Sequence, residues 1–241
     1  MRVAVVGARG RMGAAVCEAV EADPALELVA RVGSADCLDL VLDGGADVAV
    51  EFTLPATVKA NTAWLLERGV HTVVGATGLS EDDLSELESL TGPANCFVAP
   101  NFAVGAVLMM RMAELAARHF DSVEVIEFHH ERKLDAPSGT ALRTVRMIAH
   151  ARDKNGRDHG AAASTAGQPS RGLLVEGVPV HSVRMPGFVA SQEVLFGGPG
   201  QTLRIRHDSI DRACFMPGVL LAIKRISSLP GLTVGLETLL D

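Results

Sequence analysis

The start of the chain constrains its fold more strongly than any other stretch. Residues Arg2–Val6 form an apolar run typical of a strand buried in a parallel sheet. Gly7, Gly10 and Gly13 follow with the spacing G-x-x-G-x-x-G, and a helical pattern then runs to about Ala22. Glycines at such a junction permit a tight turn and let a pyrophosphate approach the helix N-terminus closely. The pattern is a variant of the dinucleotide fingerprint, and a plain strand-to-helix turn in another α/β fold remains the alternative.

The alternation of strand and helix continues to about residue 100. Short apolar runs alternate with helical patterns, which is typical of a parallel sheet. The predicted strands are 27–32, 48–52, 71–74 and 95–99. The predicted helices are a short one at 37–42, one at 55–67, and one that Ser80 caps and that ends near Ser89. We therefore predict a Rossmann-type domain with a parallel sheet.

The second half of the chain has a different pattern. A long helix is predicted at 104–119, followed by a strand at 122–128 and a helix at 140–151. Residues 152–171, which include His159, are rich in small and polar side chains and predict a loop. Strands at 179–185, 190–196 and 201–207 are separated by turns with proline and glycine. They predict a second α/β domain with a mixed, largely antiparallel sheet. A helix at 215–227 and a short segment at 232–236 end the sequence.

Composition excludes several classes of function. The formal net charge of −7 gives no general attraction to nucleic acid or to an anionic membrane. Tyrosine is absent and aromatic residues make up only 4 %, which argues against stacking on single-stranded nucleic acid. The four cysteines are scattered without zinc or redox spacing, so we expect free thiols and no metal site. No apolar stretch reaches the roughly 18 residues of a membrane span, and no signal peptide is evident. We expect a cytoplasmic protein.

A cluster of polar residues lies between the predicted strand at 122–128 and the helix at 140–151. It contains His129, His130 and Lys133, and then Ser138 in a Pro-Ser-Gly-Thr turn. Histidine and lysine can transfer protons, and the start of a helix favours a carboxylate or phosphate. The cluster therefore predicts an anion site with proton donors beside it. The alternative is a surface loop with Ser138 as a helix cap, and for Ser138 alone we favour the cap.

The end of the second predicted strand bears on the choice of cofactor. A carboxylate that binds the ribose 2′-hydroxyl of NADH usually stands there, but Gly33 occupies the place and the first carboxylate is Asp36. Arg9, Arg11 and Arg31 offer positive charge instead, and arginine matches phosphate geometry. We predict NADPH as the preferred cofactor, with NADH as the alternative. Solvated surface arginines are the competing interpretation.

The polar cluster also carries a resemblance. The sequence His-His-x-x-Lys-x-Asp-Ala-Pro-Ser-Gly-Thr-Ala at residues 129–141 resembles the signature of the dihydrodipicolinate reductase family. The segments Gly75–Gly78 and Ala99–Phe102 resemble two cofactor segments of that family. The resemblance covers essentially the whole chain. Departures are Ala76 in place of threonine, Glu51 in place of aspartate, and Gly33 where the family often has an acidic residue. The last departure predicts inefficient use of NADH.

The family implies reduction of 4-hydroxy-tetrahydrodipicolinate to tetrahydrodipicolinate with NAD(P)H, in lysine and diaminopimelate biosynthesis. It implies that His129 donates or accepts a proton, and that Lys133 protonates either the carbon next to the one that receives hydride or the ring nitrogen. His130, Lys133, Gly139 and Thr140 would bind the carboxylates of this small cyclic dicarboxylate. The implied cofactor contacts are Gly7, Ala8, Arg9, Gly10, Arg11, Met12, Gly33, Gly75, Ala76, Thr77, Ala99, Pro100, Asn101 and Phe102.

The family also implies a division of the chain. Residues 1–103 and 214–241 would form the dinucleotide-binding domain, and residues 104–213 the domain for substrate binding and oligomerisation, as a homotetramer. Asp135 could orient Lys133 or make a turn, and we favour the turn. His181, Arg184, Arg206 and His207 are expected at the surface or an interface rather than in catalysis. The alternatives are another NAD(P)-dependent reductase of an imine or dicarboxylate, and a non-catalytic NADPH-sensing module.

Overall fold

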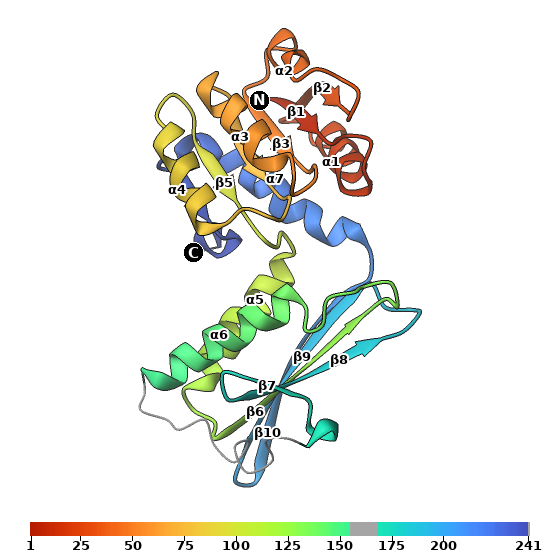
Figure 1. The fold of residues 1–241 in the computed structure, drawn as a ribbon, viewed down its shortest axis with the longest axis vertical. Helices are drawn as coiled ribbons and strands as arrows, with labels where there is room; N and C mark the ends of the chain where they lie inside the picture. Colours follow the sequence, from red (N-terminus) through yellow and green to blue (C-terminus); the bar gives the residue numbers. More distant parts are fainter. Residues whose placement is uncertain (155–167, 241) are drawn as a thin grey trace. The chain divides into compact units, whose positions relative to one another are not determined.

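A computed structural model describes residues 1–154 and 168–240 (Figure 1). The described residues form two compact units, one of residues 1–104 with 212–241 and one of residues 105–211. The predicted loop at 152–171 lies largely outside the described residues, as does His159 within it. No helix in the described ranges is long and apolar enough to cross a membrane.

The first unit is built on a parallel sheet. Its six described strands have the order β11-β5-β4-β3-β1-β2, and every pairing is parallel. The inner strands are valine-rich and buried on both faces, as this kind of sheet requires. The strands are β1 (Arg2–Val6), β2 (Glu27–Val32), β3 (Val48–Glu51), β4 (His71–Val74), β5 (Cys96–Val98) and β11 (Leu232–Val234).

Helices cover both faces of this sheet (Figure 1). The helices α3 and α4 pack on each other over one face, and α1 packs against α7. Ser80 caps α4 as predicted, because its Oγ accepts a hydrogen bond from Asp83 N at 3.1 Å. The helices are α1 (Arg11–Ala22), α2 (Asp39–Asp43), α3 (Val58–Glu67), α4 (Glu81–Leu90) and α7 (Met216–Arg225).

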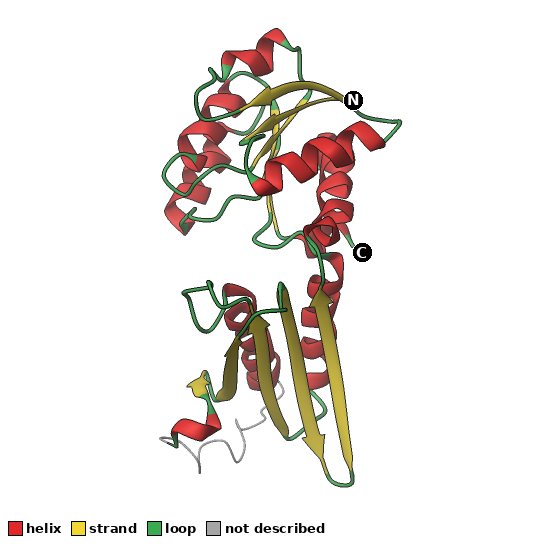
Figure 2. Ribbon diagram, turned by 90° about the vertical axis from the view of Figure 1, so that its right-hand side faces the viewer, coloured by secondary structure: helices red, strands yellow, loops and turns green. Residues whose placement is uncertain are grey.

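The second unit contains a mixed sheet with two helices packed on it (Figure 2). Its five described strands have the order β10-β9-β6-β8-β7, in which only β6 and β8 pair in parallel. Small residues of α5 and the face of α6 around Val145 and Ile148 form a core with β6. The elements are α5 (Val104–Ala117), β6 (Ser122–His129), α6 (Gly139–Asp153), β7 (Leu173–Val175), β8 (Val178–Arg184), β9 (Ala190–Gly198) and β10 (Gln201–Ser209).

The predicted fold class is confirmed, with differences at the ends of elements. Helix α3 begins at Val58 rather than at residue 55, because Thr57 N and Val58 N first close a turn onto Leu54 O. Helix α6 continues through Arg152, which sequence analysis had placed in a loop. The Arg152 side chain is buried and donates a hydrogen bond to Asp121 O, and this contact across the unit supports the last helical turn.

Candidate functional site

The glycine loop at the end of β1 has a backbone that side chains would block. Gly7 has a φ of 86°, a conformation that glycine adopts readily. A Cβ on Gly13 would lie 2.1 Å from Gly7 O, so α1 comes too close to the turn for any larger residue. Gly10 stands at the N-cap of α1 without a side-chain cap. The loop therefore has the close backbone approach that a pyrophosphate group needs.

A cleft of about 480 Å³ opens beside this loop within the first unit. The glycine loop and the ends of β2 and β3 line it, and its size suits a nucleotide. Arg9 lines the cleft, whereas Arg31 extends to an ion pair with Glu21 at 2.5 Å. Arg11 is exposed in the first turn of α1. Of the three arginines that sequence analysis proposed for phosphate binding, only Arg9 is thus found among the cleft residues.

Asp36 is a cleft residue whose role sequence reasoning missed. Its Oδ2 accepts a hydrogen bond from Gly33 N at 2.8 Å and forms an ion pair with Arg9 Nη2 at 3.0 Å. The turn that returns Asp36 to Gly33 is closed by Asp36 N and Gly33 O at 3.2 Å. A carboxylate therefore does stand at the end of β2, although it comes from three residues further along the chain. The only sign of this turn in the sequence is an aspartate three residues after a glycine, in the segment Gly-Ser-Ala-Asp at 33–36.

Glu51, at the end of β3, forms hydrogen bonds with two residues that line the cleft. Its side chain is fully buried and accepts hydrogen bonds from Thr53 and from Asn61 Nδ2, the latter at 3.1 Å. Thr53 and Asn61 both line the cleft. Burial raises the pKa of Glu51, and the hydrogen bonds from Thr53 and Asn61 oppose that rise. The departure from aspartate thus leaves a carboxylate in place that positions two polar cleft residues.

The two later segments predicted to bind the cofactor lie at the same edge of the sheet. Gly75 follows β4, and a Cβ there would lie 2.2 Å from the ring of Phe52. Phe52 contacts Phe102, which follows β5, with ring centroids 6.0 Å apart. Backbone hydrogen bonds join neighbouring strand ends here. Gly75 N donates to Glu51 O at 2.9 Å, and Ala99 N donates to Val74 O at 3.1 Å. The predicted residues 75–77 and 99–102 therefore lie at the carboxyl ends of adjacent strands, where such sheets bind ligands.

The signature loop of the second unit joins β6 to α6. His129 is the last residue of β6, and Gly139 is the first residue of α6. Ser138 is the N-cap, as predicted, and its Oγ accepts a hydrogen bond from Ala141 N at 3.2 Å. A Cβ built on Gly139 would meet no atom within 4 Å, so the start of α6 is open to an approaching group. Gly139 and Thr140 thus lie in the first helical turn, at the positive end of the helix dipole.

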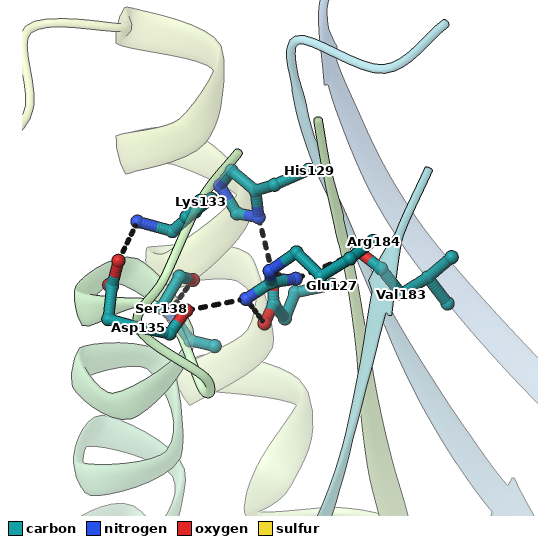
Figure 3. Close-up of polar contacts among 8 residues, drawn as sticks. Glu127, His129, Lys133, Asp135, Ser138, Val183 and Arg184 are labelled. Atoms are coloured by element: carbon teal, nitrogen blue, oxygen red, sulfur yellow. Dashed lines mark hydrogen bonds and ion pairs between the residues drawn. The ribbon is translucent and has the colours of Figure 1, made fainter. Parts of the chain in front are cut away.

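Lys133 and Asp135 form an ion pair in this loop (Figure 3). Lys133 Nζ donates a hydrogen bond to Asp135 Oδ1 at 2.8 Å, and this bond lowers the pKa of Asp135. The preference for a simple turn at Asp135 was therefore wrong, since the side chain reaches the ammonium group. His130 Nδ1 is buried and has no hydrogen-bond partner among the described residues.

The His129 ring is held by Glu127, which Arg184 holds in turn, and sequence analysis selected neither of these two residues for the site (Figure 3). Its Nδ1 contacts a carboxylate oxygen of Glu127, two residues earlier on β6. Arg184 of β8 donates two hydrogen bonds to the same carboxylate, at 2.7 and 2.9 Å. Burial raises the pKa of Glu127, but the hydrogen bonds from His129, Arg184 and Ser182 outweigh it and lower the pKa to about 2. Arg184 was expected at the surface or an interface, but its side chain is only 17 % exposed and its guanidinium is directed at Glu127.

No metal centre is evident in the described ranges, where no three potential ligand side chains gather. The chemistry that these groups permit is anion binding and proton transfer. Lys133, His130 and the start of α6 offer positive charge and donors, and His129 offers an exchangeable proton. The glycine loop and its cleft offer a place for a dinucleotide.

Comparison with known proteins gives a consistent result. Residues 1–102 match the family described as dihydrodipicolinate reductase, N-terminus, and residues 105–240 match dihydrodipicolinate reductase, C-terminus. The chain is 51 % identical to the 4-hydroxy-tetrahydrodipicolinate reductase of Mycolicibacterium vanbaalenii, over 100 % of this chain and 99 % of that protein. It is 54 % identical to the enzyme of the same name from Nocardia farcinica, over 100 % and 99 %.

A solved structure agrees with the sequence comparisons. The dipicolinate-bound dihydrodipicolinate reductase of Paenisporosarcina sp. TG-14 superposes with a TM-score of 0.86 at 38 % identity, over 99 % of this chain and 98 % of that one. The match therefore extends over both units of this chain. The resemblance seen in the signature loop is confirmed, and the chain belongs to the dihydrodipicolinate reductase family.

Proposed function

We propose that this chain catalyses the NAD(P)H-dependent reduction of 4-hydroxy-tetrahydrodipicolinate to tetrahydrodipicolinate, with release of water, in lysine and diaminopimelate biosynthesis. The observation that carries the proposal is the signature loop, in which His129 and Lys133 stand beside the start of α6. Two relatives that are named 4-hydroxy-tetrahydrodipicolinate reductase are 51 % and 54 % identical to this chain over 99 % of their own length. A more distant relative has been solved with dipicolinate, a cyclic dicarboxylate.

The first unit is proposed to bind the dinucleotide. When bound, NADPH or NADH supplies the hydride, since no side chain can do so. The glycine loop would receive the pyrophosphate, and the residues predicted after β4 and β5 would line the nicotinamide end. Arg9 and Arg11 would attract a 2′-phosphate, which supports NADPH as the preferred cofactor. Asp36 gives the ribose of NADH a hydrogen-bond acceptor, which supports NADH as a second cofactor.

The second unit is proposed to bind the substrate. His130, Lys133 and the backbone of Gly139 and Thr140 would hold its carboxylates, because a dianion needs several donors and positive charge. A substrate carboxylate would compete with Asp135 for the Lys133 ammonium, whose Nζ lies 2.8 Å from Asp135 Oδ1. Lys133 would then donate a proton as the hydride arrives, and His129 would donate or accept a proton beside it.

The test is a series of variants in the signature loop. Lys133→Ala should lower the kcat for substrate-dependent NADPH oxidation by roughly 10²-fold or more, because a proton donor and a carboxylate partner are both lost. Arg132→Ala is the matched control, because that neighbouring side chain is 81 % exposed. It should retain activity. Titration with NADPH would show that both variants still bind cofactor. Equal loss in the two variants, or none in either, would contradict the role of Lys133.

The assembly and location are also proposals. We propose a homotetramer in the cytoplasm, with subunits associating through the mixed sheet of the second unit. The support is the family, whose members the chain matches over both parts. Light scattering after gel filtration should give four times the chain mass of 25.3 kDa. A single chain mass at micromolar concentration would contradict the tetramer.

A further inference from the structure

Glu127 has an environment that an ordinary structural carboxylate does not need. It lies on β6 with no exposed surface, in the row of side chains that also contributes Val123 and Val125 to the core. A buried carboxylate requires partners, because its desolvation costs several kcal/mol in order of magnitude. The bidentate guanidinium of Arg184 meets that requirement with charge and two hydrogen bonds. The further contact with His129 is therefore not explained by the need to neutralise Glu127.

Arg184 connects this carboxylate to the signature loop. It is the register partner of His129 on the adjacent parallel strand. Its Nη2 donates to Asp135 O at 2.7 Å in addition to Glu127 Oε1 at 2.7 Å. The side chain of the same Asp135 holds Lys133. One guanidinium therefore joins the group that holds His129 to the residue that holds Lys133 (Figure 3).

The protonation states of Glu127 and Arg184 determine which ring nitrogen of His129 is available to exchange a proton. Arginine stays charged under all ordinary conditions, and an ionised carboxylate can only accept hydrogen bonds. Glu127 is therefore an acceptor, and His129 Nδ1 must carry the hydrogen in the contact between them. In the neutral ring the lone pair is then on Nε2. The side chain of His129 is only 14 % exposed, so the ring has little freedom to turn away.

We propose that Glu127, held by Arg184, is a positioning residue that fixes the ring orientation and the Nδ1–H tautomer of His129. His129 Nε2 is then the nitrogen that exchanges a proton with the substrate. This inference rests on the proposed function for its catalytic consequence, whereas the tautomer itself is a property of the protein alone.

Glu127→Gln is the decisive variant. The amide keeps the size of the carboxyl group, but it has a single acceptor oxygen for the donors Arg184 Nη1, Arg184 Nη2 and His129 Nδ1 that contact the carboxylate. The charged guanidinium competes for that oxygen and the negative charge that favours Nδ1–H is gone, so the share of the Nε2–H tautomer in the neutral ring should rise. Substrate-dependent kcat should fall by roughly 10²- to 10⁴-fold, the usual contribution of a positioned proton-transfer group. The KM for NADPH should stay unchanged.

Glu124→Gln is the matched control on the same strand. Glu124 also contacts a histidine and an arginine, with His181 Nε2 at 2.8 Å and Arg171 at 2.5 Å. Within the described residues, the hydrogen bonds of Glu124 go to His181 and Arg171 and not to the signature loop, so its variant should keep kcat. Equal losses in the two variants would show a general effect of removing charge from β6 and would overturn the inference.

Nitrogen NMR of the imidazole rings gives a readout that does not depend on turnover. The chain has eight histidines, and His129→Gln identifies the signals of His129 by their disappearance. At a pH where the ring is neutral, wild type should show a protonated Nδ1 and an unprotonated Nε2, and Glu127→Gln should show a larger share of the Nε2–H form. A protonated Nε2 in neutral wild-type His129 would overturn the proposal, even if the protein proves to have another function.

A double-variant comparison separates a role of Glu127 that acts through His129 from a purely structural role. If Glu127 acts through His129, adding Glu127→Gln to His129→Gln should cause no further loss of kcat. A purely structural ion pair would instead cause a similar additional loss in both backgrounds, and that result would overturn the inference. If wild type binds NADPH but reduces no substrate, the proposed function fails while the NMR result still decides the tautomer.

Discussion

At the scale of single residues, the charged groups of the site are held in place by other charges. Lys133 is paired with Asp135, Arg9 is paired with Asp36, and Glu127 is paired with Arg184. The first two pairs are partly exposed and contribute little to stability, because solvent screens them. Glu127 is different, since it has no exposed surface. Its ionisation should therefore be visible in the stability of the whole protein.

The acid stability of the protein should depend on Glu127. Its folded pKa is about 2, below the ordinary 4.5, so its ionised form stabilises the fold above pH 4.5. That contribution is lost as the pH falls from about 4.5 to about 2, and amounts to at most about 3 kcal/mol. Urea unfolding between pH 5 and pH 3 should show a shallower pH dependence for Glu127→Gln than for wild type. Identical slopes would contradict the assigned pKa.

Cofactor choice should respond to Gly33. A Cβ at this position would lie 2.8 Å from Arg9 Nε, but Arg9 is 73 % exposed and can move aside. Gly33→Asp should therefore add a ribose acceptor and displace a phosphate-binding arginine. The ratio of kcat/KM for NADH to that for NADPH should rise, and Asp36→Asn should lower the same ratio. An unchanged ratio in both variants would contradict the description of this end of the cleft.

The residues of the site were predictable to different degrees. His129, His130 and Lys133 are close in sequence, so their spacing alone indicated a common loop. Arg184 is 57 residues from Glu127, and only the register between β6 and β8 brings them together. Register is set by packing of the whole sheet, which a single sequence does not reveal. Asp36 was visible in the sequence, but its return to Gly33 depends on a turn of the backbone.

At the scale of elements, strands and helices were predictable where their apolar pattern is strong. The limits predicted for β1, β2 and β4 agree with the structure. The ends of α3 and α6 were less accurate, because turn closure at Leu54 and the burial of Arg152 decide them. Strand β11 has only three residues and pairs with β5, so its place depends on a distant partner rather than on its own pattern.

Gly13 should be essential to the junction between β1 and α1. A Cβ in Gly13→Ala would lie 2.1 Å from Gly7 O and 2.7 Å from Gly7 C, which are backbone atoms that cannot rotate away. We expect α1 to move, at a cost of about 1–3 kcal/mol in the free energy of unfolding. The Kd for NADPH should rise at least about tenfold, equivalent to about 1.4 kcal/mol.

Gly197→Ala is the control for this variant. Gly197 lies on β9 in the other unit, and its added Cβ would make an ordinary contact with Ser122 at 3.8 Å. It should leave the Kd for NADPH unchanged. Isothermal titration would measure both variants, and urea unfolding would report their stability. NADPH binding by Gly13→Ala with wild-type affinity would show that the glycine loop does not receive the cofactor.

At the scale of the whole molecule, the first unit is built from two separate stretches of the chain, and the second unit lies between them in the sequence. Residues 105–211 are inserted between β5 and the final segment, and α7 and β11 then return to the parallel sheet. The proposed reaction has the same division, since the residues proposed to bind the cofactor belong to one unit and the signature loop to the other. On this proposal, turnover should require both units of the chain, whereas cofactor binding should require only the first.

The most direct test is to supply wild-type protein with NADPH and freshly generated 4-hydroxy-tetrahydrodipicolinate, and to follow cofactor oxidation and product mass together. The account predicts that one NADPH is oxidised for each tetrahydrodipicolinate formed, a product lighter than the substrate by one oxygen atom. Tight NADPH binding without oxidation would contradict the account and indicate a sensing module. Oxidation only with a different imine or dicarboxylate would also contradict it and indicate another reductase.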